Sequence, residues 1–223
     1  MKILLFGGSG LLGTELKKIN SELIYPPHDM VDIAEGSELE LYIDTIKPEI
    51  IINAAAEIDN RKIEKFPTDA IRTNIVGSAN LSALCHRKGI RLVYISTDYI
   101  YKGDKGNYRE TDEILPFNIY AWTKLGGECS VKCVKNHLII RTSFGKSDFT
   151  YPDAFIDKWA SKDYVDKLAP LIYEAAVSPL IGVLNLGADR KSIFAHAKER
   201  NENVNPIKIE DTAFITPPDT SLN

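Results

Sequence analysis

Short apolar runs alternate with amphipathic stretches from the first residues of the chain onward. The apolar runs predict buried strands at 2–6, 49–53, 91–95 and 137–141, with a shorter strand at 23–25 that ends at Pro26-Pro27. Apolar positions at helical spacing predict helices over 11–19, 39–46, 68–87 and 164–177. Strands that alternate with helices are typical of a parallel sheet covered on both faces. The expected fold class is therefore α/β, a Rossmann-type doubly wound parallel sheet.

The pattern weakens in the last third of the chain. Residues 145–160 mix aromatic and acidic side chains without a clear period, whereas a late strand at 183–186 and a last helix at 192–200 are still predicted. The polar stretch 102–117 contains two glycines and a proline, which predicts a loop. We expect the tail from residue 211 onward to be irregular.

Composition and charge narrow the class of protein. The 223-residue chain is 44% hydrophobic and 26% charged, as soluble proteins are, and its net charge of -4 offers no basic surface for nucleic acid. The apolar run at 3–6 meets glycines long before it reaches the length of a signal peptide or a membrane span. We therefore expect a cytoplasmic protein with neither a membrane nor a nucleic acid as partner.

Cysteine and histidine residues form no metal-binding pattern. The cysteines number three, which argues against a disulfide framework, and we interpret Cys85, Cys129 and Cys133 as small packing residues. The four histidines are scattered at no ligand spacing. The sequence therefore predicts no metal site.

A glycine-rich turn follows the first predicted strand and opens the first predicted helix. Residues 7–13 read Gly-Gly-Ser-Gly-Leu-Leu-Gly, which satisfies both G-x-G-x-x-G and G-x-x-G-x-x-G spacing. Glycines let the backbone approach a pyrophosphate, and the N-terminus of the following helix offers unpaired N–H groups and a positive dipole end. Because the turn lies between a strand and a helix, it predicts dinucleotide binding.

The choice between NAD and NADP stays open. An acidic residue at the end of the second strand would favour NAD and a basic one NADP, but this strand ends in Tyr25-Pro26-Pro27-His28. Asp32 and Ile33 follow farther on, where they are placed to flank the adenosine.

Candidate catalytic groups cluster between residues 96 and 124. Ser96, Thr97, Asp98 and Tyr99 come at the carboxyl end of a predicted strand, where ligands bind in doubly wound sheets. Tyr120 and Lys124, four apart on the next helix, share one face. A lysine charge at this distance is expected to lower the pKa of the phenol and make it a usable proton donor.

Four motifs in this order resemble the extended short-chain dehydrogenase/reductases. They are the glycine turn, Asn53-Ala54-Ala55-Ala56, Ser96-Thr97-Asp98-Tyr99 and Tyr120-x-x-x-Lys124, and the resemblance covers about the first two-thirds of the chain. It implies binding of NADP or NAD, with hydride transfer from the reduced form, NADPH or NADH, to the 4-keto carbon of a nucleotide-linked deoxysugar. By this resemblance Tyr120 would protonate the oxygen, Thr97 would hydrogen-bond it, and Lys124 would hold the nicotinamide ribose.

The same resemblance implies the remaining binding residues. Those facing the cofactor would be Gly7, Gly10, Leu11, Leu12, Gly13, Asp32, Ile33, Ala54, Ala55, Ala56 and Ser96, besides Tyr120 and Lys124. Those facing the sugar would be Asp98, Tyr99 and Phe144. Asn74 either steadies the loop near the catalytic groups or is an ordinary asparagine on a helix face. A homodimer is also implied, since members of the family often dimerise.

The substrate region departs from the family pattern. Only residues 144–162 separate the strand ending in Arg141-Thr142-Ser143 from the next helix, and Phe144 stands where related reductases tend to have tryptophan. We expect a dinucleotide-binding Rossmann domain at 1–143 and an abbreviated substrate-binding subdomain at 144–223, partly woven into the same domain. A different deoxysugar, a smaller ketone, or completion of the pocket by a second subunit would each fit the shortening.

Other activities of the same fold remain as alternatives. Dehydratases place an Asp-Glu pair after the threonine, whereas Thr97 is followed here by Asp98-Tyr99, which favours reduction over elimination. An epimerase would need the same hydride machinery. A non-catalytic regulatory subunit that binds NAD(P) is the alternative from another class. Thr97, Tyr120 and Lys124 are all present, which favours an enzyme.

Overall fold

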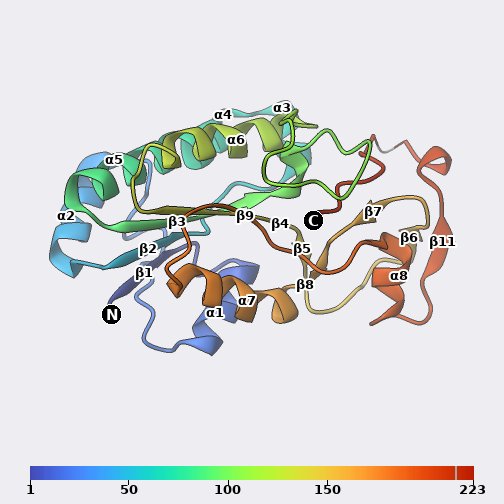
Figure 1. Cartoon of the computed structure of the whole chain (residues 1–223), viewed down its shortest axis with the longest axis horizontal. Helices are drawn as coiled ribbons and strands as arrows, with labels where there is room; N and C mark the ends of the chain where they lie inside the picture. Colours follow the sequence, from blue (N-terminus) through green and yellow to red (C-terminus); the bar gives the residue numbers. More distant parts are fainter. Residues whose placement is uncertain (214) are drawn as a thin grey trace.

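The computed structural model describes residues 1–213 and 215–223. Its centre is a sheet of five parallel strands in the order β1-β2-β3-β4-β9 (Figure 1). The strands are β1 (Ile3–Phe6), β2 (Ile50–Asn53), β3 (Arg91–Thr97), β4 (His137–Thr142) and β9 (Gly182–Asn185). The predicted strands thus pair in a parallel sheet, and the expected Rossmann-type fold class is confirmed.

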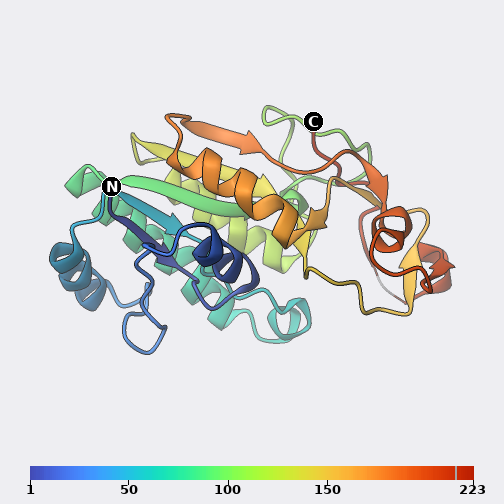
Figure 2. The ribbon, with the colours of Figure 1, turned by 90° about the horizontal axis from the view of Figure 1, so that it is seen from below.

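Helices cover both faces of this sheet because the strand side chains alternate between two cores (Figures 1 and 2). Ile3 and Leu5 point to one core and Leu4 and Phe6 to the other. The first core is closed by α1 (Leu11–Ile19) and α7 (Val165–Val177). The second is closed by α2 (Gly36–Ile46), α5 (Ser78–Lys88) and α6 (Ile119–Val131). Among the described residues, no helix has the length and apolar character needed to cross a membrane.

The chain changes direction across the sheet at β1. Ile24 bridges the outer edge of β1 through Leu4, while β2 pairs with the other edge. The carboxyl end of β1 is therefore the switch point, where a crevice opens. The strand expected at 23–25 is wrong in extent: it shrinks to this single bridge, because Pro26 and Pro27 have no N–H groups to continue the ladder.

The long helix expected at 68–87 is interrupted by a wider turn. It consists of α4 (Thr68–Ala70), the π-helical η1 (Ile71–Gly77) and α5, and it ends at Gly89 with a φ of 67°. The π-helical turn carries Asn74, which is fully buried, toward α6. A short helix that the sequence pattern missed, α3 (Asn60–Lys65), precedes it and is capped by the Asp59 side chain.

The weakly patterned region forms a small unit beyond the carboxyl ends of the main strands (Figures 1 and 2). Its pairs are β5 (Phe144–Gly145) with β8 (Asp163–Tyr164), β6 (Asp153–Phe155) with β11 (Asn205–Ile207), and β7 (Trp159–Ala160) with β10 (Lys191–Ser192). The unit also contains α8 (Ile193–Lys198) and the 3-10 turn η3 (Ile209–Asp211). Although they follow residue 143, α7 and β9 return to the main sheet.

The last residues of the chain are irregular, as expected, yet they are firmly held. Thr220 and Ser221 are fully buried, and the C-terminus lies beside the loop at 102–117 (Figure 1). Asp219 bridges Trp159, and Leu222 bridges Tyr108. The tail is therefore part of the folded structure.

Candidate active site

Two adjoining cavities of about 300 and 340 Å³ occupy the crevice at the switch point. They share Gly7, Gly10, Ala54 and Ala56. Every residue predicted for the site lines one or both of them. Asp32, Ile33 and Ala55 line the first, and Leu11, Leu12, Gly13, Ser96, Thr97, Asp98, Tyr99, Tyr120, Lys124 and Phe144 line the second.

The glycine turn is packed so closely that side chains would not fit. Gly7 has a φ of 85°, and a Cβ there would lie 2.5 Å from the carbonyl carbon of Ala54. A Cβ on Gly13 would lie 2.2 Å from the carbonyl oxygen of Gly7. These two glycines bring the N-terminus of α1 close to the end of β2, and we call the backbone of residues 7–13 the glycine cradle. No side chain in the described part of the chain caps α1 there.

The outer end of the first cavity carries an ion pair. The Asp32 carboxylate accepts a hydrogen bond from the Ala34 N–H at 2.9 Å and pairs with Arg72 at 2.6 Å. Burial alone would raise the pKa of Asp32, but these hydrogen bonds lower it below its usual value. Arg72 also pairs with Glu35. Sequence reasoning missed Arg72 because it comes from η1, 40 residues away.

Strand β3 and helix α6 bring the candidate catalytic groups together. β3 ends in Thr97, and η2 (Asp98–Ile100) begins at once, with the Tyr99 N–H donating to the Thr97 hydroxyl at 3.2 Å. Asn118 caps the N-terminus of helix α6, where its side chain accepts from the Ala121 N–H. Tyr120 therefore lies in the first turn of α6, and Lys124 lies one turn later. Both side chains reach the second cavity with Thr97.

The pKa shifts of Tyr120 and Lys124 differ from those expected from the sequence. Burial raises the pKa of the Tyr120 phenol, and the nearby Asp98 charge raises it further, against the hydrogen bond with Thr97. Burial lowers the pKa of Lys124 to about 7, against the effect of Glu128. The prediction that Lys124 depresses the phenol pKa is therefore wrong here, because both groups are desolvated.

Asn74 connects the loop after β2 to helix α6. Its side-chain amide donates to the Glu57 carbonyl at 3.0 Å and to the Thr123 hydroxyl at 2.9 Å, while its oxygen accepts from the Glu57 N–H. Thr123 in turn donates to the carbonyl of Tyr120. Of its two interpretations, the structure supports the one in which Asn74 steadies the loop.

Two lysines from the weakly patterned region also reach the site. Lys162 lines the second cavity, and burial lowers its pKa. The Lys158 ammonium donates to the Tyr99 hydroxyl at 2.7 Å and to Thr216. Nothing in the sequence pattern identified either residue. Ser96 and Thr142 also line the second cavity, and their buried hydroxyls have no hydrogen-bond partner among residues 1–213 and 215–223.

A third cavity, of about 1170 Å³, continues from the second. The two share Asn60, Tyr99 and Lys162. Large aromatic side chains line much of it, namely Phe117, Trp122, Phe149, Tyr151 and Phe155. The shortened region after Phe144 thus borders ample space for a ligand larger than a simple ketone.

Comparison with known proteins places this geometry in a family. Residues 1–166 match the family described as RmlD substrate binding domain. The chain belongs to this family. The dTDP-4-dehydrorhamnose reductase of Escherichia coli strain K12 is 34% identical over 154 residues, which cover 65% of this chain and 51% of that protein. Methionine adenosyltransferase 2 subunit beta of Pongo abelii is 30% identical over 141 residues, or 58% of this chain and 42% of that protein.

This RmlD-family chain spans about half the length of the curated relatives it matches. Solved structures align over all of it. The dTDP-4-dehydrorhamnose reductase of Bacillus anthracis, in complex with NADP, gives a TM-score of 0.88 at 27% identity and is covered over 91% of its chain. The orthologue from Clostridium acetobutylicum gives 0.90 at 25% identity and is covered over 90%.

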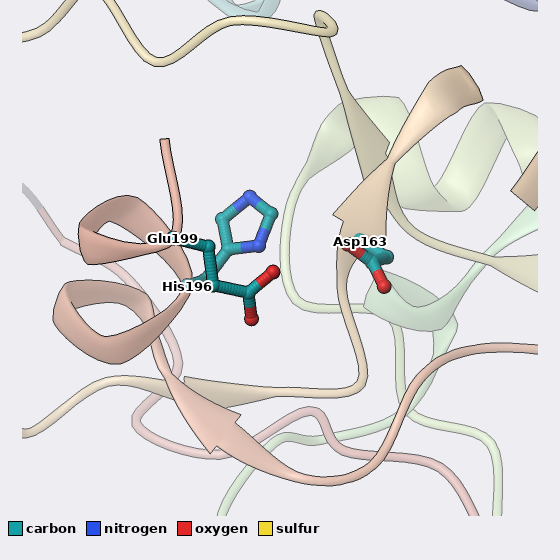
Figure 3. Close-up of side chains that lie close together, drawn as sticks. All are labelled: Asp163, His196 and Glu199. Carbon is teal, nitrogen blue, oxygen red and sulfur yellow. The ribbon is translucent and has the colours of Figure 1, made fainter. Parts of the chain in front are cut away.

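A cluster of possible metal ligands lies outside this crevice. Asp163, His196 and Glu199 present ligand atoms within 4.8 Å of one another, with one imidazole nitrogen directed toward the carboxylates (Figure 3). Lys167 and Lys191 contact both carboxylates, with Nζ atoms 2.7 and 2.5 Å from Glu199. Two ammonium groups already balance the two acids, so the structure supports an ion-pair cluster.

His196 makes the stability of the RmlD-family fold depend on pH. Burial lowers the pKa of its imidazole to about 4, with Lys162 and Lys191 adding to the effect. The His196 imidazole of the unfolded chain binds a proton near pH 6.5, whereas that of the folded chain stays neutral until the pH is near 4. The free energy of unfolding therefore decreases as the pH falls from 6.5 toward 4. We expect a loss of about 2 kcal/mol between pH 7 and pH 5.

Urea unfolding at these two pH values measures this loss, with His196→Phe as the comparison. Phenylalanine retains the stacking on Tyr164 but cannot titrate, so its loss over the same interval is smaller by about 2 kcal/mol. The pKa of Glu199, held near 2 by its lysine partners, keeps that ion pair out of the interval. Equal losses in both proteins would contradict the assignment to His196.

The burial of the three cysteines corrects the interpretation that all of them are packing residues. Cys85 is buried in the core, as expected of a packing residue. Cys129, in the last turn of α6, and Cys133, just after that helix, are both exposed, so the packing interpretation is wrong for both. Helical spacing alone did not reveal which side of α6 faces the solvent.

Proposed function

We propose that this RmlD-family chain reduces the 4-keto group of a nucleotide-linked deoxysugar with NADPH or NADH. The observation that carries the proposal is the convergence of Thr97, Tyr120 and Lys124 on one cavity that continues into the glycine cradle. The relatives named dTDP-4-dehydrorhamnose reductase, one of them solved with NADP, support the same reaction.

The first two cavities fit a dinucleotide. The glycine turn and the uncapped N-terminus of α1 would hold its pyrophosphate, with Leu11 and Leu12 beside it. Asp32 and Ile33 would flank the adenosine, and Ala54, Ala55 and Ala56 its middle. The unpartnered hydroxyls of Ser96 and Thr142 offer hydrogen bonds to a polar ligand at the other end. Because Arg72 neutralises Asp32, this acid does not by itself repel the extra phosphate of NADP.

The chain's own residues would manage the charge that develops on the ketone oxygen. When bound, the nicotinamide supplies the hydride. The raised pKa of Tyr120 keeps its phenol protonated at neutral pH, so a proton is available to the oxygen. The Thr97 hydroxyl would donate a second hydrogen bond to the same oxygen. Two donors directed at a forming alkoxide stabilise the transition state more than the ground state. Lys124 would hold the nicotinamide ribose.

The third cavity would receive the rest of the substrate. Its aromatic side chains, Trp122 and Phe149 among them, suit a nucleotide base. Lys158 and Lys162, between this cavity and the second, suit a diphosphate, and Asp98, Tyr99 and Phe144 would face the sugar.

A substrate panel tests the reaction. We would follow NADPH and NADH oxidation with dTDP-, UDP-, GDP- and CDP-linked 4-keto sugars at equal concentration. Oxidation with at least one sugar is the expected result, and the nucleotide preferred identifies the base. No oxidation with any of them, together with tight cofactor binding, would overturn the proposal.

That failure would favour a non-catalytic regulatory subunit. The observation behind this second candidate is the similarity to methionine adenosyltransferase 2 subunit beta, at 30% identity. The presence of all three catalytic candidates in one cavity favours the reductase.

A further inference from the structure

The Thr220 side chain of the C-terminal tail contacts one of the groups at the candidate site, Asp98. The Thr220 hydroxyl donates to the Oδ2 atom of Asp98 at 2.6 Å, although 122 residues separate the two. Thr220 is fully buried, and its N–H donates to the Trp159 carbonyl at 3.0 Å. A Cβ on Gly103 would lie 3.1 Å from the Thr220 methyl group, so the loop at 102–117 closes over it. The hydroxyl is therefore held in one place.

Asp98 has a different hydroxyl on each of its oxygens. Thr220 donates to Oδ2, and Thr97 donates to Oδ1 at 3.2 Å. Asp98 is only 2% exposed, and burial raises its pKa above the usual carboxyl value despite these two hydrogen bonds. Its carboxyl group is therefore able to carry a proton at a pH where ordinary aspartates are ionised.

The single proton of the Thr97 hydroxyl links the ionisation of the Asp98 carboxyl group to the proposed ketone reduction. A threonine hydroxyl has one proton. While Asp98 is ionised, that proton points to Oδ1 and is not free for a ketone oxygen in the cavity. If Asp98 is protonated on Oδ1, the carboxyl group donates to Thr97, and the threonine proton is released toward the ligand. The Tyr99 N–H already occupies one acceptor position of the same hydroxyl, and a protonated Asp98 fills the other. The Tyr120 phenol, which also contacts this hydroxyl, is then left to direct its proton to the ligand.

We propose that Thr220 is a positioning residue: by donating to Oδ2 it keeps the Asp98 proton on Oδ1, where it turns the Thr97 hydroxyl toward the substrate. The inference rests on the proposed function for its catalytic consequence, but the hydrogen-bond chain from Thr220 through Asp98 to Thr97 stands on its own distances. Thr220, which lines none of the three cavities, thus acts on the reaction without touching the substrate.

Other charged and titratable groups face Asp98 from the surrounding elements. Lys158 and Lys162, on the segments before β7 and β8, favour its ionised form. Tyr120, on α6, feels the Asp98 charge as a higher phenol pKa. Since none of these groups is changed in Thr220 variants, differences between the variants report on the tail hydroxyl.

Carbon-13 NMR of the aspartate carboxyl groups tests the contact without requiring turnover. The Asp98 signal is identified by its absence in Asp98→Asn. Thr220→Val removes a donor to the carboxylate, so we expect the pKa of Asp98 to rise by about one unit, whereas Thr220→Ser restores the parent value. Ser221→Ala is the matched control, because it removes a neighbouring tail hydroxyl that bonds to Asp219 instead.

The pH dependence of kcat tests the consequence. We expect turnover of the parent to fall as Asp98 ionises, at the pKa read by NMR, and Thr220→Val to shift this fall upward by the same amount. In Asp98→Asn the amide accepts from Thr220 and donates to Thr97, so this fall disappears from the profile. Lys124, with a pKa of about 7, contributes a separate step that all variants share.

The outcomes separate this inference from the proposed reaction. An Asp98 pKa that is the same in Thr220→Val and the parent would overturn the contact's role, as would a fall in kcat that persists in Asp98→Asn. A parent protein that turns over no ketone would overturn the reductase proposal instead, while the NMR titration would still decide what Thr220 does to Asp98. If Thr220→Val does not fold, Thr220→Ala, which also lacks the hydroxyl, takes its place, with the same rise in the Asp98 pKa expected.

Discussion

Tyr120→Phe is expected to lower kcat for ketone reduction by about 10²- to 10⁴-fold, which is the usual contribution of a positioned proton donor. The ring remains, so the shape of the cavity is kept, and only the phenolic proton is lost. Because the glycine cradle and Lys124 are unchanged, the Kd for the cofactor is expected to stay within about twofold. Single-turnover kinetics with the preferred sugar and fluorescence titration with NADPH measure the two quantities.

Tyr42→Phe provides the matched control for this experiment. Tyr42 lies on α2, half-buried against the second core and away from the cavities. Its phenol is expected to be dispensable, with kcat close to that of the parent. Turnover that survives in Tyr120→Phe would remove Tyr120 from the proton-donor role, and a parallel loss of cofactor binding would point to a structural defect instead.

Local patterns were sufficient to predict the main sheet and the position of the candidate site. The β1 strand, the glycine turn and α1 are continuous in sequence, so their geometry follows from a few neighbouring residues. The same holds for Thr97 at the end of β3 and for Tyr120 and Lys124 on one helical face. Each of these features is decided within about two turns of helix or one strand, where sequence periods are informative.

Features that depend on contacts between distant residues could not be predicted from the sequence. The pKa of Lys124 falls because the folded chain buries it against the Tyr94 ring, 4.1 Å away, and spacing on a helix does not reveal burial. Arg72 reaches Asp32, and Thr220 reaches Asp98, only after the chain has folded. The strands β5 to β8 are two or three residues long, too short for an alternating pattern to emerge.

A buried ion pair joins helix α6 to the sheet. The Arg141 guanidinium, from β4, donates to both carboxylate oxygens of Glu128, on α6, at 3.2 and 2.8 Å. Both side chains are completely buried. Arg141 also donates to the Tyr101 hydroxyl and to the Glu110 carbonyl. The pair therefore fixes α6 one turn beyond Lys124 and ties it to the loop at 102–117.

Glu128→Ala is expected to destabilise the fold by about 3–5 kcal/mol, because it leaves the Arg141 charge buried without a partner. The double variant Glu128→Leu with Arg141→Met removes both charges and fills the space, so it is expected to recover most of this loss. Urea unfolding at pH 7 measures the three proteins. A single variant within about 1 kcal/mol of the parent would mean that water or a shifted α6 solvates Arg141. Glu128 also raises the pKa of Lys124, so in Glu128→Ala that pKa falls further and less of the lysine is charged at neutral pH.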